Sequence, residues 1–246
     1  MIKNMLYFVY SVYFFIIIIA IYILFSIPIL LVYPFLGEKK HYYYSVFAKY
    51  WARTILVLVG LDPKISGRLP QSQSPFIYVF NHQSQLDILI ALAFLPAGFL
   101  FVAKEELFKI PLLGDSMRRC GYIPIKRNEA RKANETLRTL RELIDKGTSI
   151  LIFPEGTRSL DGQIGLVKRG SIMVAFETQT PLLPVVINPA YRIMPKGSFL
   201  LRPARIRLQI GVPLLFDWEN RDRAYTQEAS AKIQGELNQL LQKIKC

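Results

Sequence analysis

The sequence contains very little histidine and cysteine. Of its 246 residues, only His41 and His82 are histidines, and only Cys120 and Cys246 are cysteines. Two cysteines so far apart form no disulfide framework and fit a reducing compartment. Because no Cys or His cluster is present, we expect no metal site. The chain also lacks the Walker A pattern, the Rossmann glycine fingerprint and the Gly-x-Ser-x-Gly turn of serine hydrolases.

Acidic residues are also scarce relative to basic ones. The chain has 18 Asp and Glu against 31 Lys and Arg, a net charge of +13. A basic surface implies an anionic partner, which can be lipid headgroups, nucleic acid or an acidic protein. We expect no nucleic acid, because there is no zinc-finger spacing, aromatic RNA-binding strand signature or clear helix-turn-helix. An anionic membrane is the simplest partner beside an apolar segment.

That apolar segment lies at the N-terminus, where charge is missing altogether. No charged residue occurs between Asn4 and Gly37, and hydrophobic residues make up 52% of the whole chain. About 20 apolar residues can span a bilayer core. A secretory signal fits poorly, because the apolar run is too long and no small-x-small cleavage site follows it. The segment therefore predicts membrane anchoring.

The anchor is expected to comprise residues 1–61. Pro28 and Pro34 are expected to break or kink a continuous helix, so one helix is predicted over residues 5–27. A second apolar segment, residues 42–61, is rich in Tyr and Trp, which favour the membrane–water interface. Two arrangements fit: a spanning helix with an interfacial helix, or a helical hairpin lying in one leaflet.

After residue 62 short apolar runs alternate with helical patterns. Bounded runs predict strands at residues 76–80, 99–103, 122–125, 149–153, 182–187 and 206–212. Apolar stripes predict helices over 129–146, after 168–170 and over 226–244. Such alternation indicates an α/β fold with a mostly parallel sheet flanked by helices. We expect residues 62–246 to form this domain.

The stretch FNHQSQLD places His82 five residues before Asp87. On one regular helix five residues turn about 500°, so the two side chains would face about 140° apart. They can meet only if His82 ends the strand before the helix and Asp87 lies in the first helical turn. The pair would then be a general base and the carboxylate that orients it. The alternative is a loop histidine bonded to a capping aspartate.

The stretch FPEGTRS, residues 153–159, follows a predicted strand directly. Glu155 and Arg158 leave the strand end together, and Gly156 permits a tight turn. Arginine is a natural phosphate partner because its donors form a planar fork. The alternative is an ordinary turn with a local ion pair.

Further bases follow two other predicted strands. Lys104 lies in VAKEEL, and GYIPIKR ends in Lys126 and Arg127. Each alone is typical of a solvated charge. Because the carboxyl ends of parallel strands share one edge of a sheet, these bases are expected to converge there, beside the histidine. That edge would suit a phosphate group.

The ordered stretches NHQSQLD, GYIPIKR, FPEGTRS and PLLPVVI resemble the four sequence blocks of the glycerolipid acyltransferases. Among these enzymes the likeness is greatest to those that acylate lysophosphatidic acid. The resemblance covers about residues 60–215, and VAKEEL and VKRGS also resemble connecting segments of the family. It implies the glycerolipid acyltransferase fold with an N-terminal membrane-associated helical segment.

The resemblance also implies residue roles. His82 would be the general base and Asp87 its partner. The residues implied to hold the acceptor phosphate are Lys104, Lys126, Arg127 and Arg158, and those implied to shape the acceptor site are Glu155, Gly156 and Thr157.

The implied reaction transfers a fatty acyl group from an acyl thioester to the sn-2 hydroxyl of 1-acylglycerol 3-phosphate, giving phosphatidic acid. Acyl-CoA or acyl-ACP would be the co-substrate, so acyl carrier protein is a candidate partner; no cofactor, metal or acyl-enzyme is expected. The expected location is the cytoplasmic face of the inner membrane. The alternatives are another lysolipid acceptor, a hydrolase with Ser84 or Cys120 as nucleophile, and a non-catalytic lipid-binding module.

Overall fold

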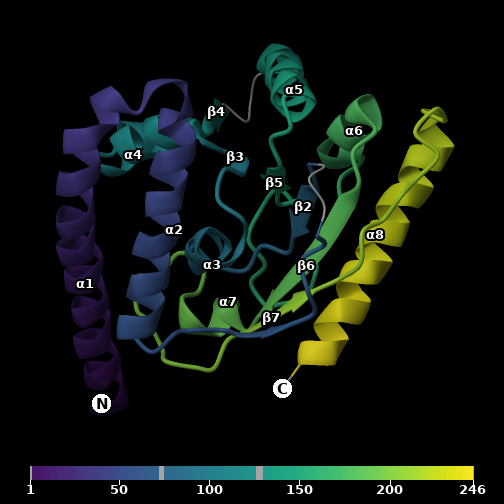
Figure 1. The fold of residues 1–246 in the computed structure, drawn as a ribbon. Coiled ribbons are helices and arrows are strands. Elements are labelled where there is room, and N and C mark those ends of the chain that lie inside the picture. Colours follow the sequence, from purple (N-terminus) through teal and green to yellow (C-terminus); the bar gives the residue numbers. More distant parts are fainter. Residues whose placement is uncertain (1, 72–74, 126–129, 246) are drawn as a thin grey trace.

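A central sheet is covered by helices on both faces (Figure 1). The computed structural model describes residues 2–71, 75–125 and 130–245. The helices are α1 (Ile2–Val32), α2 (Lys40–Leu58), α3 (Leu86–Phe94), α4 (Leu113–Cys120), α5 (Ala130–Asp145), α6 (Arg169–Thr178), α7 (Ala190–Ile193) and α8 (Arg223–Ile244). Three short 3-10 helices are also present. Two of them, η1 (Tyr33–Phe35) and η2 (Gly37–Lys39), lie between α1 and α2, and the third, η3 (Glu105–Lys109), precedes α4.

The sheet has seven strands in the order β1-β7-β6-β2-β5-β3-β4. They are β1 (Lys64–Ser66), β2 (Ile77–Phe80), β3 (Leu100–Lys104), β4 (Ile123–Ile125), β5 (Ile150–Ile152), β6 (Leu182–Asn188) and β7 (Arg207–Ile210). Every pairing is parallel except that of β6 with β7. The mostly parallel α/β sheet predicted from the sequence is therefore confirmed.

The central strands are buried because helices cover both of their faces. All residues of β2 and β6 are buried, as expected for the near-continuous apolar runs of parallel strands. Helix α8 packs on β6 and β7 with one apolar side, which includes Ile233, Leu237 and Leu241. Helix α2 packs on α3. The core therefore fixes the end of β2, from which the candidate site begins.

The predicted strands and helices match the observed elements to within a few residues. Strand β1 and the short helices α4 and α7 were not predicted; β1 is exposed and carries Ile65 as its one apolar residue. Helix α1 runs through Pro28 and ends at Val32, two residues before Pro34, so a break at Pro28 was wrong. Proline deprives the carbonyl of Leu24 of its partner, but Leu24 is exposed, and only about one helical turn follows Pro28.

Helices α1 and α2 lie side by side as a hairpin that is fixed to the α/β domain (Figure 1). The hydroxyl of Tyr10 donates to the carbonyl of Val59 at 2.6 Å. Tyr22 reaches Ser116 of α4, with 2.9 Å between the two hydroxyl oxygens. The first bond joins α1 to the end of α2 within the hairpin, and the second fixes the hairpin to the domain.

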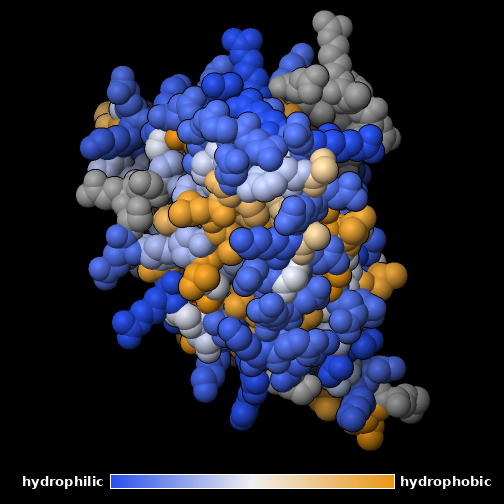
Figure 2. Space-filling model, turned by 90° about the vertical axis from the view of Figure 1, so that its right-hand side faces the viewer, coloured by the Kyte–Doolittle hydropathy of each residue, from blue (hydrophilic) through white to orange (hydrophobic). Residues whose placement is uncertain are grey.

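Helix α1 leaves most of its apolar surface exposed. Among the described residues, it is the one helix long and apolar enough to cross a bilayer, over Ile2–Ile29. The opposite side of the molecule, where α8 lies, is mainly hydrophilic with smaller hydrophobic patches (Figure 2). Large apolar exposure is therefore a property of the α1 side, and it is compatible with membrane association.

Asn81, directly after β2, extends the pairing of β2 with β6 through its side chain. Its amide donates to the carbonyl of Ile187 at 2.9 Å, and its carbonyl oxygen accepts the N–H of Ile187 at 2.8 Å. Asn81 is almost fully buried. The side chain thereby joins the start of the His82 turn to the strand beside it.

We expect Asn81→Ala to lower the free energy of unfolding by about 2–4 kcal/mol, because it leaves a buried N–H and a buried carbonyl of Ile187 unpaired. Chemical denaturation followed by circular dichroism measures the loss. Asn238→Ala, on α8, is the control and should change the stability by less than about 0.5 kcal/mol. Equal stability of the two variants would contradict the role given to Asn81.

Candidate active site

His82 and Asp87 meet across a strand-to-helix turn. Strand β2 ends at Phe80, and Asp87 is the second residue of α3. His82 lies in the turn between them, with its Nδ1 2.8 Å from Oδ2 of Asp87. This is the geometry that the spacing required for the two side chains to meet, and a loop histidine bonded to a capping aspartate would share it.

The Asp87 carboxylate organises the whole turn. Its Oδ2 also accepts the backbone N–H groups of Gln83 at 2.6 Å and Ser84 at 2.8 Å. The side chain is 0% exposed, and the N-terminus of α3 favours its negative charge. Since a carboxylate oxygen accepts, Nδ1 of His82 carries the proton and Nε2 presents the lone pair. The turn therefore fixes the tautomer that a general base needs.

The imidazole ring is also fixed by stacking. The ring of Phe153 lies 4.0 Å from it, centroid to centroid, at an interplanar angle of 22°. The His82 side chain keeps 17% of its surface exposed. The ring is thus held on one face and remains open to a substrate.

Glu155 clamps the histidine turn to the loop after β5. Its Oε1 accepts the backbone N–H of His82 at 2.8 Å, and its Oε2 accepts that of Gly165 at 2.7 Å. The N–H of Ser159 closes the contact by donating to the carbonyl of His82 at 2.7 Å. Burial raises the pKa of Glu155 above its usual value, and the bonds from these N–H groups offset part of that rise. Glu155 is 5% exposed, so it shapes the site by positioning backbone.

The turn is held from its other side by residues near α7. The hydroxyl of Ser84 donates to the carbonyl of Met194 at 2.8 Å. The side-chain amide of Gln83 donates to the carbonyl of Gly162 at 3.1 Å and accepts the N–H of Tyr191 at 3.4 Å. Gln83 and Ser84 stand in the quoted motif, but the sequence offered no signal for these roles, since their partners are distant along the chain.

Three bases from separate segments converge on the turn Gly156–Arg158. Gly156 has φ +72° and lies so close to Lys168 that a Cβ there would be 2.9 Å from the Lys168 ammonium. Lys196 donates to Thr157 Oγ1 at 2.9 Å. Arg158 forms no ion pair with any described residue. Lys168 and Lys196 were not predicted; Lys168 stands in the noted segment VKRGS, whereas Lys196 is brought here by tertiary structure alone.

The remaining predicted bases are less closely tied to the histidine. Lys104 ends β3, two strands from β2 in the sheet, and its ammonium pairs with Glu106 at 3.3 Å on the surface. Its phosphate role stays a prediction. Lys126 and Arg127 lie outside the described residues, directly after β4, which pairs with β3.

The two candidate nucleophiles of a hydrolase are not presented to a substrate. Ser84 is fully buried and its hydroxyl is engaged with Met194. Cys120 is buried on α4, and burial raises its pKa to about 12, so almost no reactive thiolate exists at neutral pH. The described residues contain no group of three or more His, Cys, Asp or Glu that could hold a metal ion.

The chain is similar to several known proteins. A family model described as Acyltransferase matches residues 63–188. The chain is 35% identical over 86% of its length to 1-acyl-sn-glycerol-3-phosphate acyltransferase BAT2, chloroplastic, of Brassica napus, and 37% identical over 76% of its length to LPAT1, chloroplastic, of Arabidopsis thaliana. It spans 60% and 52% of those two relatives. The crystal structure of the 1-acyl-sn-glycerophosphate (LPA) acyltransferase PlsC from Thermotoga maritima is similar over 99% of both chains, with a TM-score of 0.83 and 25% identity.

We expect Glu155→Gln to lower kcat about 10–100-fold with little change in KM. The amide can accept only one of the two backbone N–H bonds, so the His82 turn shifts, and a small misplacement of a catalytic group can cost about 100-fold. Steady-state kinetics measure the split. Glu228→Gln, an exposed residue on α8, is the control. A raised KM with unchanged kcat would instead place Glu155 in substrate binding.

Proposed function

The chain belongs to the acyltransferase family, and on that premise we propose that it transfers a fatty acyl group from an acyl thioester to the sn-2 hydroxyl of 1-acylglycerol 3-phosphate, giving phosphatidic acid. The observation that carries the proposal is a partly exposed, oriented imidazole beside a basic turn: Ser159, the residue after that turn, donates its N–H to the carbonyl of His82. The names of the two plant relatives and of the Thermotoga protein support the choice of acceptor.

In the proposed reaction Nε2 of His82 removes the proton from the acceptor hydroxyl. The oxygen attacks the thioester carbonyl, the C–O bond forms, and the C–S bond breaks as the tetrahedral intermediate collapses. The thiol carrier leaves with the proton that His82 held. Asp87 stabilises the imidazolium between these steps. The substrate hydroxyl takes the place of a serine, so no acyl-enzyme forms, and the thioester is already activated, so the chemistry uses no metal or cofactor.

The acceptor phosphate is assigned to the basic turn. Arg158, Lys168 and Lys196 offer three positive charges around Gly156–Arg158. Charge-assisted bonds from such groups to phosphate oxygens are among the stronger interactions in proteins. Lys104, at the end of β3, remains a further candidate, and Lys126 and Arg127 keep the role that the resemblance implies. A phosphate held here would lie beside the turn that carries His82.

We assign residues 1–61 to a membrane anchor and residues 62–246 to the catalytic domain. Helix α1 has 31 residues, a length of about 46 Å at about 1.5 Å per residue. Its bonds to Ser116 and Leu201 hold it along the domain. A helix held in this way cannot cross a bilayer without drawing the polar domain into the hydrocarbon, which supports a hairpin lying in one leaflet. We place it on the cytoplasmic face of the inner membrane.

His82→Ala should lower turnover by at least about 100–10,000-fold, since it removes the general base. The assay follows phosphatidic acid formation by the purified full-length protein with acyl-CoA and with acyl-ACP. His41→Ala is a matched control, because His41 lies on α2 and contacts the carbonyl of Arg119 through its ring. Near-normal turnover of His82→Ala at equal folded content would exclude the mechanism.

Arg158→Ala and Lys196→Ala should each raise the KM for 1-acylglycerol 3-phosphate about 10–100-fold, the loss of one hydrogen bond to a charged group. A monoacylglycerol without phosphate should be used equally poorly by the variants and the unaltered protein. Arg221→Ala, exposed and away from the site, is the control. If another lysolipid gives the higher kcat/KM, the acceptor proposed here is wrong, whereas the acyl transfer stands.

A further inference from the structure

The loop that joins α7 to β7, residues Met194–Ile206, is fastened to α1. We call it the basic loop. The N–H of Leu201 donates to Ser11 Oγ at 2.7 Å, and the ring of Phe199 meets that of Phe15, with 6.3 Å between the centroids. The loop lies at the same end of the molecule as the N-terminus (Figure 1). It therefore forms one surface with the first half of α1.

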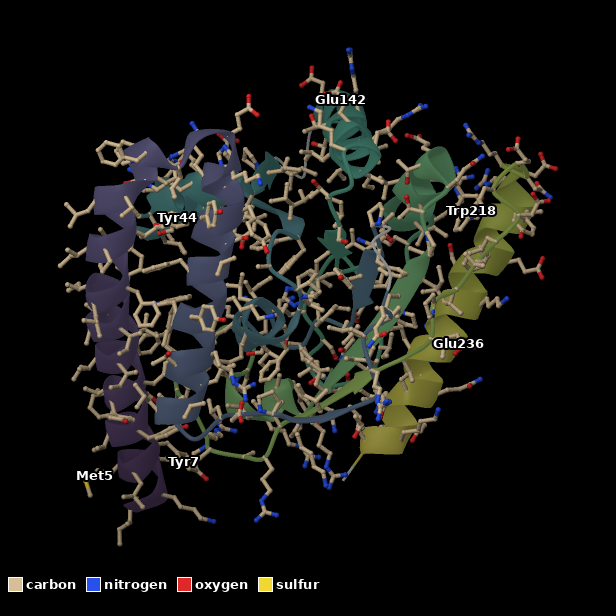
Figure 3. The ribbon with its side chains drawn as sticks, in the orientation of Figure 1. Met5, Tyr7, Tyr44, Glu142, Trp218 and Glu236 are labelled. Atoms are coloured by element: carbon tan, nitrogen blue, oxygen red, sulfur yellow. The ribbon has the colours of Figure 1, made fainter. Side chains whose placement is uncertain are left out.

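The apolar part of this surface is continuous. Phe199 is 68% exposed, although a residue of its size is usually covered. Met5 of α1 points away from the body of the molecule (Figure 3). The other large exposed apolar residues in this half of α1 include Phe8, Val9, Val12 and Ile16. Phe199 thus extends the exposed apolar face of α1 onto the catalytic domain.

The basic loop and its flanking residues carry charge of one sign. Between residues 178 and 216 the chain has no Asp or Glu, and its bases are Arg192, Lys196, Arg202, Arg205 and Arg207. Arg202 and Arg205 are exposed, and neither forms an ion pair with a described residue. Glu142 on α5 lies at the opposite end of the molecule (Figure 3).

The neighbouring sheet edge carries an unfavourable contact of the same kind. Lys64 of β1 lies directly opposite Arg207 of β7 in the register, and both are exposed. Like charges opposite one another on adjacent strands are destabilising. An anionic surface placed against this edge would offset that repulsion.

We propose that the basic loop docks on an anionic lipid surface beside α1, with Phe199 entering the interface and Arg202 and Arg205 meeting headgroup phosphates. Apolar and basic side chains on one surface are the combination that binds anionic membranes. The inference rests on the proposed placement of α1 in one leaflet and is independent of the acyl acceptor. The carbonyl of Met194, at the start of the basic loop, accepts a hydrogen bond from the Ser84 hydroxyl of the His82 turn. Docking of the loop would therefore fix the distance between that turn and the lipid.

The charge is tested with Arg202→Gln/Arg205→Gln in the full-length protein. Partitioning is measured by flotation with vesicles of phosphatidylcholine alone and of equal parts phosphatidylcholine and phosphatidylglycerol. Each base near an anionic surface contributes about 1 kcal/mol, so the double variant should bind the anionic vesicles about 30-fold more weakly. Its binding to phosphatidylcholine should not change. Arg221→Gln/Arg223→Gln, at the start of α8, removes the same charge elsewhere and should bind as the unaltered protein does.

The apolar contact is tested with Phe199→Ser, which should weaken partitioning into both kinds of vesicle about tenfold or more. Leu215→Ser is the control, because Leu215 is equally exposed but follows Leu214, which pairs with the other end of β6, at Leu182. With substrate dispersed in detergent, all these variants should have normal turnover. The vesicle-binding result therefore tests the docking proposal independently of the proposed reaction.

Several results would overturn the proposal. One is equal loss of anionic-vesicle binding in the Arg202/Arg205 and Arg221/Arg223 variants, which would make the effect one of net charge alone. Another is lost turnover of these variants in detergent, which would assign Phe199, Arg202 or Arg205 to the active site. A third is that the Arg202/Arg205 variant binds acyl carrier protein more weakly but binds vesicles normally, which would show that the basic loop binds an acidic protein instead of lipid. If the unaltered protein bound neither kind of vesicle, neither α1 nor the basic loop would be a lipid-binding surface.

Discussion

The site depends on one buried carboxylate. Removing a carboxylate such as Asp87 from water costs several kcal/mol unless its oxygens are bonded. Here Oδ2 accepts three N–H groups, one from the imidazole and two from the backbone of the turn, whereas Oδ1 is buried and has no hydrogen-bond partner among the described residues. The bonds to Oδ2 offset part of the cost of burying the charge, and one of them also fixes the imidazole tautomer. Backbone geometry, charge burial and base chemistry are therefore set together.

The turn is then held from two directions. Glu155 bonds to the backbone of His82 and ties it to the loop that carries Arg158. Ser84 and Gln83 bond to Met194 and Tyr191, which lie beyond β6. Because these contacts are buried and hydrogen-bonded, movement of either loop would leave polar groups unpaired. The general base and the proposed phosphate turn thus keep a constant separation, which a reaction between two positioned groups requires.

The same loops connect the site to the outside of the molecule. The segment that receives the Ser84 hydroxyl continues into the basic loop, which is bonded to α1. Helix α1 in turn is bonded to α4 and to the end of α2. Apolar exposure is concentrated along α1, while the α8 side is mainly hydrophilic (Figure 2). The fold therefore has a distinct lipid side, and the loops of the site reach it.

Much of the molecule followed from local sequence properties. Short bounded apolar runs predicted six of the strands, and apolar stripes predicted the large helices, because both patterns reflect which parts of each element are buried. The spacing of His82 and Asp87 predicted the turn, because helical geometry allows them to meet in no other way. The motif order indicated the family. The continuation of α1 through Pro28 and the small strand β1 were missed, because solvent exposure and strand pairing are not visible in local pattern.

What only the tertiary structure decided is which distant residues share the site. Lys196 reaches Thr157 across 39 positions of the chain, and the Ser84 hydroxyl meets Met194 across 110. Glu155 carried a strong motif signal, yet its bonds to the His82 and Gly165 N–H groups could not be read from it. The sequence specifies residue types and local conformation, because these depend on near neighbours. Contacts between segments depend on how the sheet orders its strands, and that order is fixed only when the whole core packs.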